Sequence, residues 1–177
     1  MRIESYTLAD TPFNYLISFP FPEDERQVLE DSIRSIDLKT PTEVLQSLET
    51  EMAKRLTSKG YYSSKGNPDA CRLWFPDFKN EIDFYNPPKK IAIEVEKSEV
   101  KRVIHDMLKL VNGSMTFMPK VKYGVLVMPN IYVRKSGKKS PFFSTVKREL
   151  PFYFQKIIPD NCNLQDVLII VYNMESV

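Results

Sequence analysis

The sequence predicts an α/β domain in which helices alternate with buried β-strands. Two near-continuous apolar runs, at 123–128 (YGVLVM) and 166–172 (DVLIIVY), are typical of strands that are covered on both faces. Amphipathic helical patterns surround these runs, and helices that alternate with buried strands indicate an α/β sandwich. The length of 177 residues fits one domain, 1–177, with a single buried core.

Composition narrows the class of protein. With 27% charged and 12% aromatic residues the chain is expected to fold, and a net charge of +2 does not by itself indicate a polyanionic partner. The first residues lack a signal-peptide pattern, and no stretch approaches the ~18 apolar residues of a membrane span. Cys71 and Cys162 are isolated, which argues against a thiolate zinc site. We therefore expect a cytoplasmic protein without membrane contact.

The N-terminal part is expected to be helical. Residues 1–40 combine an aromatic and proline-rich lead-in with apolar residues at helical spacing over 23–36, and they are expected to extend a core of about 41–172. A second helix begins at a capping box, Thr40-Pro41-Thr42-Glu43, and Gly60 supplies its stop signal.

Short strands are expected in the middle of the chain. The stretches 73–75 and 82–85 are rich in aromatic and β-branched residues and are separated by turn-forming pieces. The sequence NPPKK at 86–90 is typical of a reverse connection. A hairpin is the simplest arrangement for this region.

Two further helices are expected downstream. The apolar spacing over 99–112 predicts an amphipathic helix that an Asn-Gly pair ends, and a second pattern covers 142–158, where Pro151 must break or kink the helix. Asp106 and Lys109 lie three residues apart on the first of these helices. We expect them to form a local ion pair rather than part of an active site, although a pair near the acidic strand could orient that strand's carboxylates.

Acidic residues on two neighbouring strand segments predict a metal site. Strict alternation over 91–97 points Glu94 and Glu96 in the same direction, with Cα atoms roughly 6.5 Å apart. The turn at 86–90 folds Asp83 back beside them. Three convergent carboxylates would repel one another without a cation, and hard oxygen ligands suit magnesium or manganese. Such a site favours phosphoryl transfer, because the ion activates a water for in-line attack.

The order of these elements resembles that of the PD-(D/E)xK nuclease superfamily: an Asp on one strand, a turn and then an acidic strand, set between two helices. Within it, the segment EIDFYNPPKKIAIEVEK at 81–97, with the next helix and the strand at 122–129, is most similar to restriction endonucleases of the BamHI/BglII type. The resemblance covers about residues 44–130 and lies in element order and spacing more than in residue identity. It implies a restriction-endonuclease-like α/β fold: a central mixed β-sheet of about five strands flanked by α-helices.

The resemblance also implies roles for individual residues. Asp83 and Glu94 hold the metal, and the backbone carbonyl of Val95 is a further ligand. Glu96 stands where most relatives carry a lysine, which leaves it as general base or third ligand. Lys97 is the alternative for the lysine role, but strand alternation points it to the opposite face, so we favour Glu96.

A carboxylate on the helix before Gly60 completes the implied site. Glu49 and Glu51 flank the apolar stripe of this helix about equally, so the residues alone do not choose between them. The resemblance selects Glu51, which would hold a second ion or its water.

The activity that the resemblance implies is magnesium-dependent cleavage of DNA, with manganese as a possible substitute. A homodimer is expected, because cutting both strands of a symmetric site calls for a two-fold arrangement. Basic residues suited to phosphate contact occur after the acidic strand and in a basic segment between a core strand and a helix. They are Lys97, Arg134, Lys135, Lys138 and Lys139.

Two other functions stay open. A structure-selective or repair nuclease of the same fold would prefer branched DNA to plasmid, and the 177 residues are few for a restriction enzyme with an extended recognition surface. A non-catalytic nucleic-acid or protein interaction module would keep the fold but hydrolyse no DNA.

Overall fold

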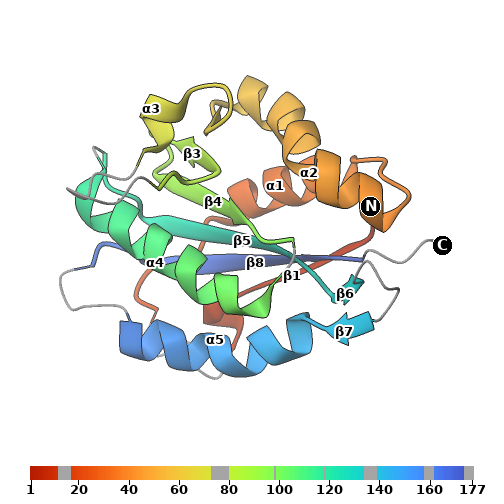
Figure 1. The fold of residues 1–177 in the computed structure, drawn as a ribbon. Coiled ribbons are helices and arrows are strands. Elements are labelled where there is room, and N and C mark those ends of the chain that lie inside the picture. Colours follow the sequence, from red (N-terminus) through yellow and green to blue (C-terminus); the bar gives the residue numbers. More distant parts are fainter. Residues whose placement is uncertain are drawn as a thin grey trace.

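A mixed six-stranded β-sheet with helices on both faces forms the centre of the computed structural model (Figure 1). The structure describes residues 1–11, 17–72, 80–97, 99–117, 119–133, 139–157 and 162–173. In spatial order the strands are β1 (Ile3–Thr7), β8 (Asp166–Tyr172), β5 (Tyr123–Pro129), β4 (Ile91–Val95), β3 (Phe84–Asn86) and β2 (Tyr62–Ser63). Strands β4, β5 and β8 are parallel and the other neighbours are antiparallel. The predicted α/β fold is confirmed, with six strands where about five were expected.

Two pairs of helices cover the sheet. One face carries α1 (Glu23–Arg34) and α2 (Pro41–Leu56), and the other carries α4 (Val100–Thr116) and α5 (Phe143–Ile157). The shorter elements are η1 (Leu8–Asp10), η3 (Thr57–Lys59), α3 (Pro68–Cys71) and a separate hairpin of β6 (Ile131–Val133) and β7 (Lys139–Pro141). None of the helices in the described residues is both long and apolar enough to cross a membrane.

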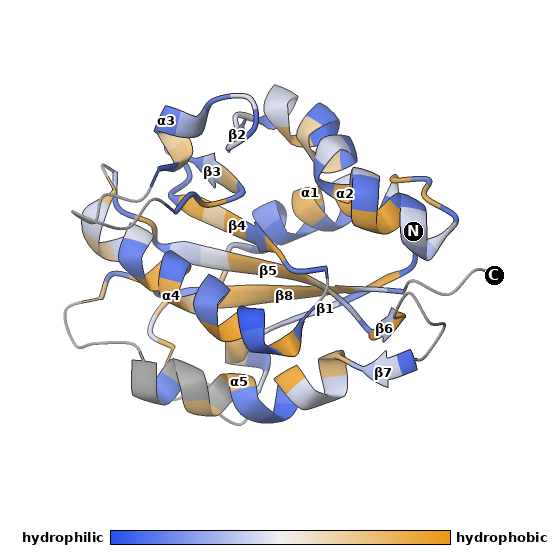
Figure 2. Ribbon diagram, in the orientation of Figure 1, coloured by the Kyte–Doolittle hydropathy of each residue, from blue (hydrophilic) through white to orange (hydrophobic). Residues whose placement is uncertain are grey.

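Side-chain alternation in β4 separates two apolar layers. Ile91 and Ile93 pack in the layer beneath α1 and α2, while Ala92 packs in the layer shared with α4 and α5. The apolar colouring of the central strands follows this burial on both sides (Figure 2). Because successive strand residues face opposite ways, Glu94 lies on the α4 side, where Asp106 and Lys109 of α4 are also buried.

The start of α2 follows from local sequence. The side chain of Thr40 accepts a hydrogen bond from the backbone N–H of Glu43 at 3.2 Å, and the Glu43 carboxylate accepts one from the Thr40 N–H. This is the predicted capping box. The helix passes into η3, and Gly60 follows with φ +87°, a left-handed conformation that favours glycine.

Several expectations about elements are wrong. The Asn-Gly pair does not end α4, which runs through Gly113 to Thr116 with Gly113 buried against the rest of the fold. Of the two effects expected of Pro151, a break or a kink, the break does not occur, because α5 continues past it to Ile157. Strand β1 was not predicted, and it pairs with β8 at the sheet edge, so the N-terminal residues supply a strand as well as α1. The strand expected at 73–75 lies outside the described residues.

Candidate active site

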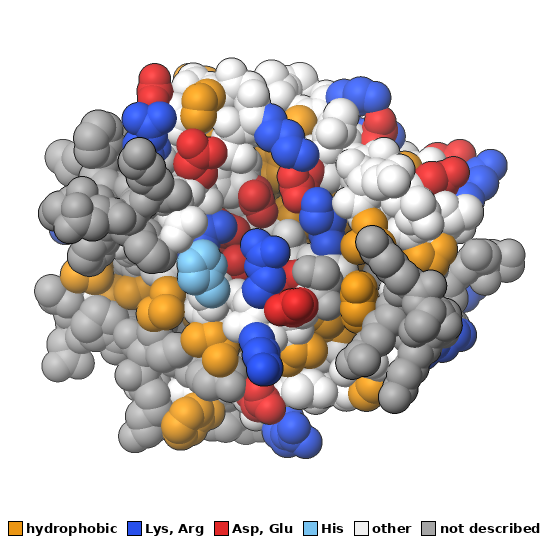
Figure 3. Space-filling view, viewed as in Figure 1, with side chains coloured by type: hydrophobic (Ala, Val, Ile, Leu, Met, Phe, Trp, Pro, Cys, Tyr) orange, Lys and Arg blue, Asp and Glu red, His pale blue; other side chains and the backbone are white. Residues whose placement is uncertain are grey.

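A small polar pocket lies where β4 ends, beside α2 and α4. Its volume is about 170 Å³, and five acidic and three basic side chains line it together with Val95. The formal excess of negative charge suits a cation. Acidic and basic side chains gather between α2 and α4 in the space-filling view (Figure 3). The charged lining residues are Glu49, Asp83, Glu94, Glu96, Asp106, Lys97, Arg102 and Lys109.

Asp83 and Glu94 lie side by side on one face of the sheet. Asp83 comes just before β3, whose Phe84 pairs with Ile93 of β4, and the side chains of Asp83 and Glu94 line the same pocket. They are close enough for the charge of Asp83 to raise the pKa of Glu94. The backbone N–H of Val95 donates a hydrogen bond to Oδ2 of Asp83 at 2.8 Å, which fixes this carboxylate against the end of β4.

Glu94 is buried, and only one of its carboxylate oxygens is paired. Its exposed fraction is 1%, and Nζ of Lys109 donates to Oε2 at 2.5 Å. The other oxygen, Oε1, is buried and accepts no hydrogen bond from the described residues. Burial and the neighbouring Asp83 raise the pKa of Glu94 well above its usual value, against the opposite effect of Lys109. An unpaired buried carboxylate oxygen is costly, and a bound cation would satisfy it.

Glu96 does not join these two carboxylates in a common ligand set. Its Oε1 accepts hydrogen bonds from the backbone N–H groups of Lys97 at 2.8 Å and Glu99 at 3.1 Å, and Arg102 lies 3.5 Å from Oε2. Among the described residues, no group of three or more His, Cys, Asp or Glu side chains could hold a metal ion. Glu96 lines the same pocket as Asp83 and Glu94, but its Oε1 is held by backbone N–H groups of the chain that leads into α4.

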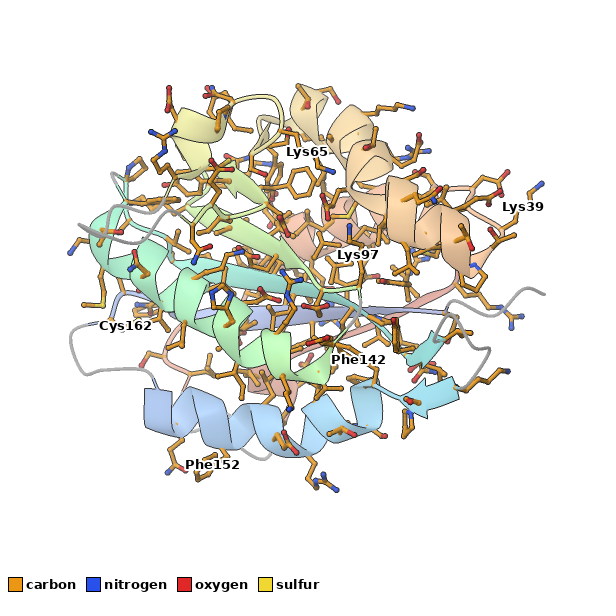
Figure 4. The ribbon with its side chains drawn as sticks, viewed as in Figure 1. Lys39, Lys65, Lys97, Phe142, Phe152 and Cys162 are labelled. Carbon is orange, nitrogen blue, oxygen red and sulfur yellow. The ribbon has the colours of Figure 1, made fainter. Side chains whose placement is uncertain are left out.

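Lys97 faces the pocket, contrary to expectation. Strand β4 ends at Val95, so the alternation that pointed Lys97 to the opposite face does not extend to it. Its ammonium forms an ion pair with Glu49, and it lies between α2 and the end of β4 (Figure 4).

Glu49, not Glu51, is the α2 carboxylate at the pocket. Glu49 also pairs with Lys65 at 2.7 Å, and although burial acts to raise its pKa, Lys65 and Lys97 hold that pKa below the usual value. Glu51 pairs with Lys54 and Arg55 and is not part of the pocket lining. Two residues along a helix are separated by about 200° around its axis, so only one of them can face β4.

Lys109 and Asp106 were expected to form a local ion pair, with orientation of the acidic strand as the alternative, and both residues line the pocket. Nζ of Lys109 lies 3.9 Å from Oδ1 of Asp106. Its shorter contact, at 2.5 Å, is with Oε2 of Glu94 on β4. Burial raises the pKa of Asp106 to about 7, and Lys109 opposes that rise. The sequence carries a signal for the contact between α4 and Glu94. Asp106 and Lys109 border the apolar stripe of α4, and this helix must pack on the acidic strand.

Most of the residues expected to contact DNA lie outside the part of the chain that the structure describes. Arg134, Lys135 and Lys138 lie outside the described residues. Lys139 is exposed at the start of β7, in the hairpin opposite Val133. A second pocket of about 560 Å³ lies between this hairpin and the start of α4, next to the turn that Glu96 holds.

Comparison with known proteins identifies the family and the fold of this chain. The model of the family described as "Putative halobacteria restriction endonuclease" matches residues 22–172. The chain belongs to this family. No curated protein matches the sequence. A similar solved structure is the restriction endonuclease BglII in complex with a DNA 16-mer, with a TM-score of 0.64 and 9% identity over 97% of this chain and 78% of that one. The restriction-endonuclease-like fold is thus shown both by the family and by this structure.

Proposed function

We propose that this member of the restriction endonuclease family is a DNA endonuclease that hydrolyses phosphodiester bonds with a divalent metal ion, magnesium or manganese. The observation that carries the proposal is the buried Oε1 of Glu94, which has no hydrogen-bond partner among the described residues and belongs to the same pocket as Asp83. The pocket around it is lined by five acidic and three basic side chains, a formal excess of negative charge. Carboxylate oxygens in a pocket of this kind suit a hard divalent cation.

Asp83 and Glu94 would hold the ion, with the backbone carbonyl of Val95 as a further ligand. Two carboxylates are a sufficient protein contribution, because magnesium usually keeps several waters and takes one or two carboxylates. When bound, the ion activates water and offsets the negative charge that develops on the phosphate. Glu96 then acts by holding the turn between β4 and α4 in place, rather than as a third ligand or a base.

Glu49 lies at the pocket position that the resemblance gave to Glu51. Its two oxygens are held by Lys97 and Lys65, so a carboxylate and an ammonium group from different elements are fixed at the rim of the pocket. Lys97 and Arg102 add positive charge beside the metal ligands. Positive groups at that place would attract a phosphodiester into a pocket whose acidic members would otherwise repel it.

DNA is the proposed substrate. Support comes from the family and from the fold shared with BglII, whose structure contains DNA. The sequence also places basic residues in the connection between β6 and β7. A homodimer remains part of the proposal, because cutting both strands of a symmetric site requires two pockets related by a two-fold axis.

Incubation of the purified protein with plasmid, viral and branched DNA tests this function. We expect discrete plasmid fragments with Mg²⁺ or Mn²⁺ and none with EDTA. Cleavage confined to branched substrates would replace the restriction assignment with a structure-selective nuclease. Absence of hydrolysis of every DNA with either ion would contradict the proposal and favour a non-catalytic module.

A further inference from the structure

The positive charge that touches the proposed metal ligands comes from α4 and not from the acidic strand. The strand position that relatives fill with lysine holds Glu96, and Lys97 is paired with Glu49. Lys109, with a side chain that is 10% exposed, reaches Oε2 of Glu94 at 2.5 Å and lines the same pocket.

We propose that Lys109 is a positioning residue that sets metal preference: it holds Oε2 of Glu94, so that Glu94 offers only Oε1 to the ion. The inference rests on the proposed metal site. The two oxygens of Glu94 have unlike surroundings, since one is bonded to an ammonium group and the other is buried with no partner among the described residues. Lysine and ion would therefore use different oxygens and need not compete.

A purely structural ion pair does not explain this arrangement. A buried pair offsets its desolvation only when further hydrogen bonds satisfy the remaining lone pairs, and Oε1 of Glu94 is left out. Lys109 also has more acidic neighbours than the one partner of a simple ion pair. Besides Glu94, Asp106 lies 3.9 Å from its Nζ, and Asp83 lines the same pocket. A cation at Oε1 would balance the negative charge of these carboxylates that Lys109 alone does not balance.

One-oxygen coordination has a consequence for selectivity. Magnesium requires near-ideal octahedral geometry, and manganese suits the same oxygen ligands, whereas calcium accepts six to eight ligands and takes carboxylates with one or both oxygens. While Lys109 occupies Oε2, calcium cannot use both oxygens of Glu94. Removing the ammonium frees Oε2 and should favour calcium over the smaller ions.

The test is a titration of the DNA-free protein with Mn²⁺ and with Ca²⁺ by calorimetry. In Lys109→Met we expect the ratio of the Ca²⁺ dissociation constant to the Mn²⁺ constant to fall by about tenfold or more. Losing a positive charge changes the affinity for both ions alike, so that effect cancels in the ratio. Lys109→Arg, which can still hold Oε2, should keep the wild-type ratio. The matched control is Lys101→Met, which removes the exposed lysine of the same helix and should also leave the ratio unchanged.

An unchanged ratio in Lys109→Met, or an equal shift in Lys101→Met, would overturn the inference. If Lys109→Met does not fold, the wild-type protein decides: a crystal structure with Mn²⁺ should show Glu94 bound through Oε1 with Lys109 on Oε2, and binding through both oxygens would contradict us. These measurements need no DNA. A wild-type protein that shows the predicted metal behaviour but cuts no DNA would refute only the proposed function.

Discussion

The carboxylate of Asp83 is tied to the last residue of β4, because the backbone N–H of Val95 donates to its Oδ2 at 2.8 Å. Asp83 comes just before β3 and Val95 ends β4, so the bond closes the antiparallel pair at the point where both strands leave the sheet. Burial raises the pKa of Asp83, and Lys109 and the Val95 N–H both oppose that rise. The hydrogen bond thus orients Asp83 toward Glu94 and favours its charged form.

The first prediction separates the two carboxylates of α2. Glu49→Gln should lower Mg²⁺-dependent DNA cleavage by about tenfold or more, because it weakens the ion pairs that hold Lys97 and Lys65 at the pocket. Glu51→Gln changes the same side chain on the opposite flank of the helix and should leave the rate within about twofold. Initial rates on plasmid measure both. A loss confined to Glu51→Gln would restore the assignment that the resemblance implied.

The second prediction concerns Asp106 and pH. Its pKa is raised from 3.8 to about 7 in the folded protein by burial, so between these values the folded state binds more protons than the unfolded state. Its contribution to stability therefore falls as pH rises through this window, by up to about 4 kcal/mol. Asp106→Asn should lose less stability than wild type between pH 4 and pH 7. Urea unfolding at several pH values measures this, and parallel curves for the two proteins would contradict it.

The third prediction tests the start of α2, the helix that carries Glu49. Thr40→Ala removes the acceptor for the Glu43 N–H and should lower the free energy of unfolding by about 1 kcal/mol. Thr42→Ala, an exposed position inside the same first turn, is the matched control and should change it by less than about 0.5 kcal/mol. Urea midpoints provide the comparison. Equal effects would mean that the capping bond adds no stability.

Local pattern was enough to predict the elements that carry the site. The alternation over 91–97 predicted β4 with Glu94 on its polar side, and the capping box predicted where α2 begins. Both features depend on residues within a few positions of one another, where period and hydrogen-bonding chemistry act directly. The α/β class followed from the order of such elements, and the mixed sheet was what the resemblance to the nuclease superfamily implied.

What could not be predicted depends on contacts between distant segments. Strand β1 exists because it pairs with β8 at the other end of the chain, and IESYT alone is a weak strand pattern. Lys109 meets Glu94 only because α4 crosses β4 in one orientation, and Glu49 reaches Lys97 only because α2 presents that flank. The predicted direction of the Lys97 side chain was wrong because side-chain alternation holds only within a strand, and β4 ends at Val95.

The most direct measurement of the central claim is the rate of Mg²⁺-dependent plasmid cleavage by Asp83→Asn. This variant keeps an oxygen that can accept the Val95 N–H but removes the charge, so we expect the rate to fall by roughly 10²-fold or more while folding and DNA binding persist. Asp69→Asn, which changes an exposed aspartate on α3, should cut at the wild-type rate. Wild-type cleavage by a folded Asp83→Asn protein would contradict the assignment of Asp83 and Glu94 as the metal-binding pair.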